Sequence, residues 1–406
     1  MGLLPGPLSP RLREAVVRVG TWIPSFARGA EALAYFTGVR VGAETVRRQT
    51  EAAGAALVEM ETAEAARLQR EMPAPPDGPR VQQLSADGAM VPLRGGEWAE
   101  AKSLAVGEVE AARGADGEPV ARAVGVSYFS RLTDSAAFGR LALPELHRRG
   151  TATAGTVAAV LDGSPWLQVF VDLHRPDAVR ILDFPHAVES LTTAVQATLG
   201  VGAVASAAWL ARHAHELKTG DPDAVLAALA ALPVHDAADP DAAARQRDES
   251  LAYLSARREQ IAYARFQAMG LPIGSGMVES ANKLVVEERL KGPGMHWDRG
   301  NVDPMLALRC AAANDRWDEV WPRVVRSLRR ATDPCPTRVR RPPGLSAAQA
   351  SRPVRRPRPP RPRVAPMPAD RPKTIVGGRP TDHHAWKKAA ALAVARKAGA
   401  APSTKR

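Results

Sequence analysis

The stretch TVAAVLDG at residues 156–163 is an apolar run that ends in an aspartate and a glycine. A short apolar run bounded by turn residues is typical of a buried strand. The stretch VQQLSADG at residues 81–88 has the same form. Asp162 and Asp87 therefore each stand where a strand would hold a carboxylate rigidly. Asp-Gly is also a common turn dipeptide, and either pair taken alone is better explained as a plain turn.

Working outward, the sequence alternates between strand-like and helical patterns. A helix is predicted at 131–147, and the alanine-rich region 187–270 is predicted to be helical, with loops near 220–222 and 239–240. Strands are predicted at 81–84, 90–93, 104–109, 121–128, 156–161, 167–171 and 179–182. These patterns predict an α/β fold with a mixed sheet and a helical region between two parts of the core.

The region before the first strand, residues 9–80, is predicted to be helical. Ser9 precedes Pro10, which suits a helix cap followed by a first-turn proline. Segments 26–36 and 43–57, separated by a glycine-containing turn, have a helix-turn-helix pattern. Three side chains of the second segment could reach phosphates or base edges, namely Arg47, Arg48 and Gln49. An ordinary helical hairpin with solvated charges is the alternative.

A third carboxylate stands out in the stretch IGSGMVESANK at residues 273–283. The glycine-rich start provides a helix N-terminus, which favours nearby anions such as a DNA phosphate. Glu279 follows in the first turns of this helix, with Asn282 and Lys283 on neighbouring positions of the same face. Taken alone, the stretch is better explained as a capped helix with a surface Glu–Lys pair.

Composition indicates a polyanionic partner. The chain has 406 residues, a formal net charge of +12 and a sequence pI of about 10.2, which favours nucleic acid as partner. Residues 331–406 are rich in proline and basic residues, and we predict a disordered tail that attracts DNA, with a short helix at 385–398.

The two cysteines, Cys310 and Cys335, suit a reducing compartment. Neither a signal peptide nor an apolar run long enough to span a membrane is evident, so we expect a cytoplasmic protein.

Five motifs together carry a family resemblance. DG at 87–88, DGxxW at 162–166, ILDFPHA at 181–187, IGSGxVES at 273–280 and KGxGMHW at 291–297 occur in this order. They resemble the bacterial insertion-sequence transposases of the Kra type, relatives of the Mutator-like group. The resemblance implies a ribonuclease-H-like catalytic domain with an all-helical insertion between the second aspartate and the glutamate. It divides the chain into a helical DNA-binding domain (1–80), a first core part (81–186), the insertion (187–270), a second core part (271–330) and the basic tail (331–406).

The resemblance also implies the chemistry. Asp87, Asp162 and Glu279 would hold two Mg²⁺ ions, for which Mn²⁺ can substitute, and these would serve DNA cleavage and strand transfer. Asp183 and His186 match an auxiliary signature, although His186 could equally be a structural histidine at a strand–helix corner. Asp172 and Asp177 compete with Asp162 for the second position.

Partners follow from the same resemblance. Double-stranded DNA, as terminal inverted repeats and as target, would be bound on the bacterial nucleoid by a homo-oligomer, with no membrane involved. Arg289, Lys291 and Trp297 could hold a flanking strand, the ring stacking on a base; a core Trp297 with two solvated cations is the alternative. Two rival functions remain open, a nuclease on the same fold without strand transfer and a catalytically inactive DNA-binding protein.

Overall fold

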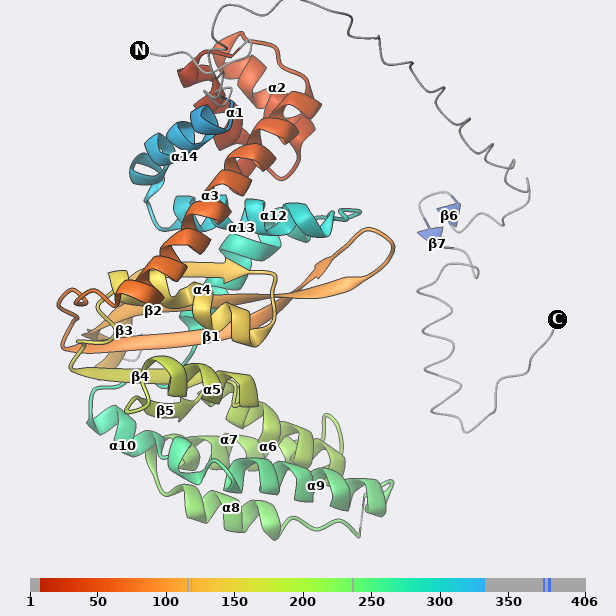
Figure 1. Cartoon of the computed structure of the whole chain (residues 1–406). Helices are drawn as coiled ribbons and strands as arrows, with labels where there is room; N and C mark the ends of the chain where they lie inside the picture. Colours follow the sequence, from red (N-terminus) through yellow and green to blue (C-terminus); the bar gives the residue numbers. More distant parts are fainter. Residues whose placement is uncertain are drawn as a thin grey trace, which may run out of the picture. The chain divides into compact units, whose positions relative to one another are not determined.

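The computed structural model describes residues 8–114, 117, 119–235, 237–332, 375–376 and 379–380 (Figure 1). The chain divides into two units, Met1–Pro336 and Thr337–Arg406. In the second unit, the short strands β6 (Ile375–Val376) and β7 (Arg379–Pro380) pair antiparallel. The predicted disorder of the tail and the predicted helix at 385–398 otherwise lie outside the described residues.

Three helices open the first unit, as predicted: α1 (Pro10–Trp22), α2 (Phe26–Thr37) and α3 (Ala43–Glu71). The Ser9 hydroxyl accepts a hydrogen bond from the Leu12 N–H at 3.3 Å and caps α1. Gly38 ends α2 in the left-handed conformation, with φ +71°. The helix-turn-helix spacing is thus present, but α3 runs well beyond the predicted end at residue 57.

The centre of the unit is a five-stranded mixed sheet in the order β3-β2-β1-β4-β5. β1, β2 and β3 form an antiparallel meander, and β4 and β5 run parallel to β1. The strands are β1 (Val81–Pro92), β2 (Trp98–Arg113), β3 (Pro119–Arg131), β4 (Thr156–Leu161) and β5 (Val179–Leu182). The fold is therefore mixed α/β, as expected, with an open sheet.

Successive side chains of each strand point to opposite faces of the sheet, and each face packs against different helices. Leu84 and Val157 pack with α4 (Ser135–Arg148) and α5 (Pro165–His174) on one face. Residues of the opposite parity, such as Ala89 and Val91, pack against the helical stretch 276–313 on the other face. Ala158 and Val160 of β4 point to this second side as well, where they meet the helical region after β5. Both faces are buried, as a sheet with parallel strands requires.

The region between β5 and residue 270 is helical, as predicted, and its helices gather beside β4 and β5 (Figure 1). Among its described loops, those at 220–221 and at 231–235 and 237–239 lie close to the predicted positions. The elements are α6 (Phe184–Leu199), α7 (Val204–Thr219), α8 (Pro222–Ala230), α9 (Pro240–Ser255), the 3₁₀ turn η1 (Arg258–Gln260) and α10 (Tyr263–Ala268). One hydrophobic cluster joins them to the sheet through Ile181 and Leu182.

The last part of the unit returns to the sheet and then to the N-terminal helices. α11 (Gly276–Ala281), a π-helical turn η2 (Asn282–Glu287) and α12 (Glu288–Leu290) follow one another without a break. α13 (Arg299–Ala313) and α14 (Trp317–Thr332) come next and pack against α3 (Figure 1). A single cluster thus joins the first and last helices of the unit.

Two local predictions were wrong. Residues 167–171 belong to α5 rather than to a strand, because Leu167, Phe170 and Val171 have helical spacing and bury one face of the helix. Asp87 and Gly88 do not form a turn: β1 continues through them to Pro92, because β2 keeps pairing with it along this stretch.

Within the described part of the chain, the helices include none that is both long and apolar enough to cross a membrane.

Candidate active site

Asp87 and Asp162 lie at the same level of the sheet. The parallel register pairs Leu84 with Ala159, and three further residues along each strand lead to Asp87 and Asp162. Asp87 shares its parity with Ala89, and Asp162 shares its parity with Val160, so both point away from α4 and α5. Asp87 and Asp162 are therefore opposite each other across the two neighbouring strands, and their carboxylates lie on the same face of the sheet.

Hydrogen bonds occupy both oxygens of each carboxylate. Asp87 accepts from the Gly88 N–H at 2.7 Å and from the Asn282 amide at 2.8 Å. Asp162 accepts from the Ser164 N–H at 2.7 Å and from the Ser164 hydroxyl at 2.8 Å. Partial burial raises the pKa of Asp87, and the charge of Asp162 raises it further. The hydrogen bonds from Gly88 and Asn282 and the charge of His186 lower it in part. The two carboxylates are close enough to repel each other.

Glu279 reaches this neighbourhood through its helix. Asn282, which is buried, ties the helix to Asp87, and Glu279 lies three residues earlier, on an adjacent position of the same face. The Glu279 side chain is exposed. The π-helical turn begins at Asn282, and such turns occur frequently at functional sites. The helix therefore brings Glu279 alongside the strand that carries Asp87.

Asp183 links the end of β5 to the start of the helix that carries Glu279. The pairing of Leu161 with Leu182 places it level with Asp162, directly after the end of β5. Its side chain is fully buried and accepts from the Ser275 N–H at 2.7 Å and bonds the His186 ring at 2.7 Å. Ser275 directly precedes α11, so Asp183 fixes the start of the helix that carries Glu279.

His186 stands at the corner between β5 and α6 and is half-exposed, with 43% of its side chain accessible. Its hydrogen bond to Asp183 raises its pKa, and the charge of Asp162 contributes further. His186 thus combines both interpretations left open by the sequence. It closes a strand–helix corner, and it presents an imidazole next to the candidate carboxylates.

The pKa of His186 gives a measurable pH dependence. Because folding raises it above its ordinary value of 6.5, the stability that protonated His186 contributes is fully present below 6.5 and is lost as pH rises through the raised value. We expect the His186 resonance to titrate above 6.5 in an NMR pH series. Asp183→Asn should move that titration downward, and an unchanged midpoint in this variant would contradict the assignment to Asp183.

The helical region also holds the loop that carries Asp162. Tyr253 on α9 donates its hydroxyl to the Asp162 carbonyl at 2.6 Å, and Arg257 donates to the Gly163 carbonyl at 2.8 Å. Gly163 has φ +85°, and a Cβ there would come within 2.5 Å of the Arg257 side chain, so only glycine fits. Neither Tyr253 nor Arg257 was anticipated, because nothing in their local sequence points to a loop 91 residues away.

The competing aspartates lie elsewhere. Asp172 is on α5, exposed, and paired with Arg180. Asp177 precedes β5, at the opposite end of that strand from Asp183, and pairs with Arg175 at 2.7 Å. The structure thus brings Asp162, not these two, next to Asp87.

The residues proposed to bind DNA have mixed placements. Arg47 on α3 is flanked by Glu44 and Glu51, each at 2.6 Å, while Arg48 is exposed and Gln49 half-buried. Lys291 pairs with Glu287 at 2.7 Å.

Arg289 and Trp297 are buried, with 2% and 7% of their surfaces accessible. Stacking of Trp297 on a base is therefore not possible in this conformation, and the alternative of a core tryptophan is the one that fits. That alternative also placed Arg289 in solvent, and this part of it was wrong. The Arg289 guanidinium packs against the rings of Phe26 and Trp297 inside the protein.

The contacts of Asp87, Asp162 and Asn282 are partly suited to a metal ion. Carboxylate and amide oxygens are ligands that Mg²⁺ prefers, and Asn282 Oδ1 is buried without a hydrogen-bond partner. An ion would neutralise the repulsion between Asp87 and Asp162. As they stand, however, the described side chains form no group of three His, Cys, Asp or Glu residues that could hold a metal ion. Asp162 would first have to turn away from Ser164, and Glu279 would have to turn inward.

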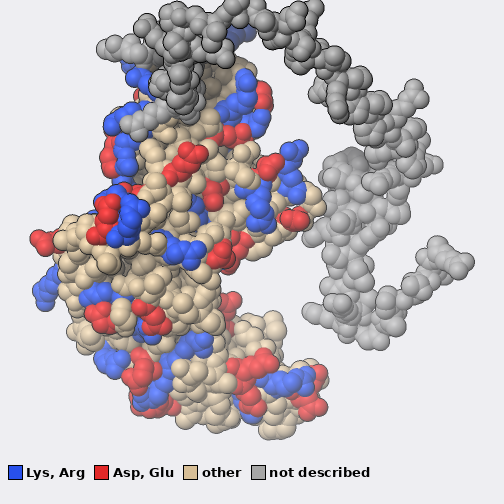
Figure 2. All heavy atoms as spheres, viewed as in Figure 1, with Lys and Arg blue, Asp and Glu red and all other residues tan. Residues whose placement is uncertain are grey.

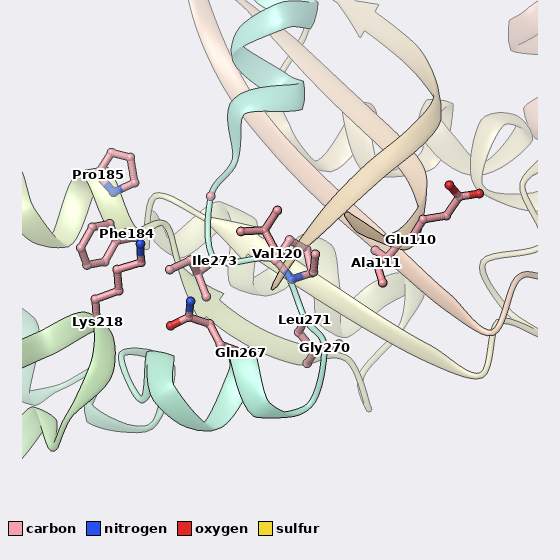
Figure 3. A pocket seen from close by; sticks show the side chains of 14 residues that line it. Glu110, Ala111, Val120, Phe184, Pro185, Lys218, Gln267, Gly270, Leu271 and Ile273 are labelled. Carbon is pink, nitrogen blue, oxygen red and sulfur yellow. The ribbon is translucent and has the colours of Figure 1, made fainter. Parts of the chain in front are cut away.

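One cavity of about 360 Å³ is lined by His186 and Tyr253, and another lies beside Phe184 and Pro185, directly after Asp183 (Figure 3). The latter measures about 370 Å³ and lies between the end of the β2–β3 hairpin, the start of α6 and residues 270–274. Phe184 and Ile273 line it, with Lys218 and Glu110 as the charged groups. Because neither cavity is lined by any of the three candidate carboxylates, we do not assign the chemistry to either.

Comparison with known proteins adds no assignment. No protein-family model matches the chain, and no curated protein matches it significantly.

Proposed function

We propose that this protein is a Mg²⁺-dependent DNA transposase whose core is ribonuclease-H-like. The strand order, with an antiparallel meander followed by two strands parallel to β1, supports the fold proposal. The observation that carries the functional proposal is the common level and face of Asp87 and Asp162, together with the bond from Asn282 to Asp87. The sequence motifs name three carboxylates; the geometry supports Asp87 and Asp162 directly, and it supports Glu279 only through the bond of Asn282 to Asp87.

The chain's own residues divide the work of the proposed site. Asp87, Asp162 and Glu279 would hold two Mg²⁺ ions, which supply charge neutralisation at the attacking and leaving oxygens when bound. Asn282 orients Asp87, and Ser164 and Tyr253 position the segment of Asp162. Asp183 keeps the helix of Glu279 in place. His186 offers a raised-pKa imidazole that can donate a hydrogen bond to a phosphate oxygen.

The positive charge of the chain is concentrated after residue 332, which suggests that DNA is first attracted to this part of the chain. Basic residues after position 332 exceed acidic ones by more than the +12 of the whole chain, so residues 1–332 have a net negative charge. On the face shown in Figure 2, basic and acidic side chains are intermixed over the described residues. We therefore assign most of the non-specific DNA affinity to the tail and end recognition to α2 and α3.

Deletion of residues 337–406, which leaves the first unit intact, should weaken binding to duplexes of unrelated sequence. The slope of log K against log salt should become shallower by about 0.9 for each phosphate that the tail neutralises in the full chain. Fluorescence anisotropy between about 50 and 200 mM salt measures this slope. An unchanged slope would place the non-specific DNA-binding residues in the first unit instead.

The function itself is tested with DNA that flanks the coding sequence, because an insertion sequence carries its ends there. Labelled flanking DNA, a supercoiled target plasmid and the full chain are incubated with Mg²⁺, or with Ca²⁺ as a control. Joining of a labelled 3′ end to the plasmid supports transposition. Cleavage without joining favours the nuclease alternative. Binding without cleavage favours the inactive DNA-binding protein.

The proposed homo-oligomer follows from the same chemistry, because two DNA ends must be brought together. It predicts a paired-end complex containing more than one protein copy. Light scattering on the DNA-bound protein measures this, and a complex of one copy with one end would contradict it.

A further inference from the structure

A second cavity, of about 520 Å³, lies between the N-terminal helices and the far end of the helix that carries Glu279. Residues 24–26 and α3 form one side, and residues 294–298 form the other. Four of its lining side chains are cationic or offer an indole N–H, namely Arg47, Arg94, Arg289 and Trp297. It is separate from the candidate carboxylates, none of which lines it.

Arg289 is a buried cation without an acidic partner. Its Nε donates to the Gly20 carbonyl at 3.2 Å and its Nη1 to the Pro24 carbonyl at 3.0 Å. Its Nη2 is buried and makes no hydrogen bond, and none of the ion pairs among the described residues includes it. Burial, reinforced by Arg309, lowers the pKa of Arg289 to about 10, so the group stays charged at neutral pH. An uncompensated buried charge is costly.

Trp297 provides a second buried donor without a partner. Its indole Nε1 is buried and makes no hydrogen bond, and its ring lies 5.1 Å from the Arg289 guanidinium. The backbone around it is fixed, because the Trp297 N–H donates to the Pro92 carbonyl at 3.0 Å and its carbonyl accepts from the Arg94 N–H at 2.9 Å. A rigid, unsatisfied N–H beside an uncompensated cation calls for an explanation, and a bound anion is one that would serve both groups.

The acidic groups around this cavity are already engaged. Glu51 accepts from Arg47 at 2.6 Å and from Asn301 at 2.9 Å. Asp298 lies 3.9 Å from Arg94 and caps α13. Arg94 itself is 75% exposed at the rim, which leaves it able to turn toward an anion.

We propose that this cavity binds a phosphate group. Because the free arm of Arg289 and the Trp297 indole N–H are both closed to solvent in this conformation, the cavity wall would have to shift for a phosphate oxygen to accept from them. Arg94 would then close over the phosphate from the rim. The bound charge would compensate the buried guanidinium. If the proposed function holds, the phosphate belongs to the DNA backbone; the same chemistry would also accept a free phosphate or a nucleotide.

The cavity would also set the geometry of bound DNA. Arg289 follows Glu279 by ten residues on the stretch formed by α11, η2 and α12, a distance of about 15 Å at the helical rise. One stretch of helix would thus hold one phosphate at its far end and present Glu279 at its near end, so that binding at the cavity fixes the part of the duplex that reaches Asp87.

The test measures the thermal midpoint of the full chain in sodium phosphate and in sodium chloride at equal ionic strength. Phosphate should raise the midpoint of the wild type by several degrees more than chloride does. Trp297→Phe keeps a ring but removes the N–H, and Arg94→Gln changes only the exposed rim. Each should weaken phosphate binding by about tenfold, and Arg289→Gln should abolish it. Arg212→Gln, at an exposed position outside the cavity, should respond as the wild type does.

Equal effects of phosphate and chloride on the wild type would overturn the proposal, as would a full phosphate response in both Trp297→Phe and Arg94→Gln. Displacement of phosphate by duplex DNA would assign the cavity to the DNA backbone. Displacement by a nucleotide but not by DNA would assign it to a free phosphate compound. Asp87→Asn should keep the phosphate response. Phosphate binding and DNA cleavage are thus separate measurements. Phosphate binding without any DNA cleavage by the wild type would disprove the proposed function and leave the cavity proposal standing.

Discussion

Replacement of Asp87 by Asn is expected to lower the rate of DNA cleavage by about a thousandfold or more, since loss of a metal-binding carboxylate removes several kcal/mol of transition-state stabilisation. The same replacement should raise the stability of the folded protein at neutral pH. Asp87 is partly buried and lies near Asp162, and both effects disfavour its charged form. An uncharged Asn avoids this cost. Stability gained together with activity lost is typical of a residue kept for function.

The pH dependence of this stability difference has a definite sign. The pKa of Asp87 is raised above its ordinary value of 3.8, so its contribution favours the folded state at acidic pH and is lost as pH rises through the raised pKa. The thermal midpoints of the wild type and Asp87→Asn should therefore converge near pH 3 to 4 and separate toward neutrality, with the variant higher. Asp172→Asn, at an exposed aspartate, is the matched control and should keep cleavage. A destabilised Asp87→Asn that still cleaves DNA would show that Asp87 is structural.

Replacement of Glu279 by Gln is expected to cause a similar loss of cleavage, of about a thousandfold, with little change in the thermal midpoint. Glu279 is exposed, and none of the hydrogen bonds or ion pairs among the described residues involves its side chain; its charge contributes to folding only through the N-terminus of α11, a small surface effect. The measurement is single-turnover cleavage of flanking DNA by the full chain, together with a thermal melt of each variant.

Glu287→Gln provides the matched control on the same helical stretch. Glu287 pairs with Lys291 at 2.7 Å and is 42% exposed, and loss of such a surface pair costs at most about 1 kcal/mol. This variant should cleave at the wild-type rate. Equal activity of the Glu279 and Glu287 variants would remove Glu279 from the site and leave Asp87 and Asp162 without a third carboxylate.

Parts of the fold that depend on local sequence could be predicted. β4 and β5 have the predicted bounds; β4 reads as the continuous apolar run of a buried parallel strand, and β5 is apolar except for Arg180. The capped start of α1 and the glycine end of α2 also follow from local chemistry. The strand predicted at 167–171 was wrong although a correct signal was present: Ser164 and Pro165 suit a helix start, and the apolar spacing is helical.

The site could be predicted only as a set of separate candidates. Asp87 was expected at a turn, and nothing local shows that β2 continues to pair with β1 beyond it. Asn282 was noted beside Glu279, but its bond to Asp87 spans 195 residues and depends on how the helix packs. Tyr253 and Arg257 could not be found at all, because their roles exist only once α9 lies beside the loop of Asp162.

The central claim is that Asp87, Asp162 and Glu279 bind a pair of divalent ions at one place. The most direct test is a crystal of the full chain with Mn²⁺ and a cleaved DNA end, measured for anomalous scattering. Two peaks about 3.5–4 Å apart between these three carboxylates are the predicted result. No peak at this place, or peaks held by Asp172 or Asp177 instead, would contradict the account.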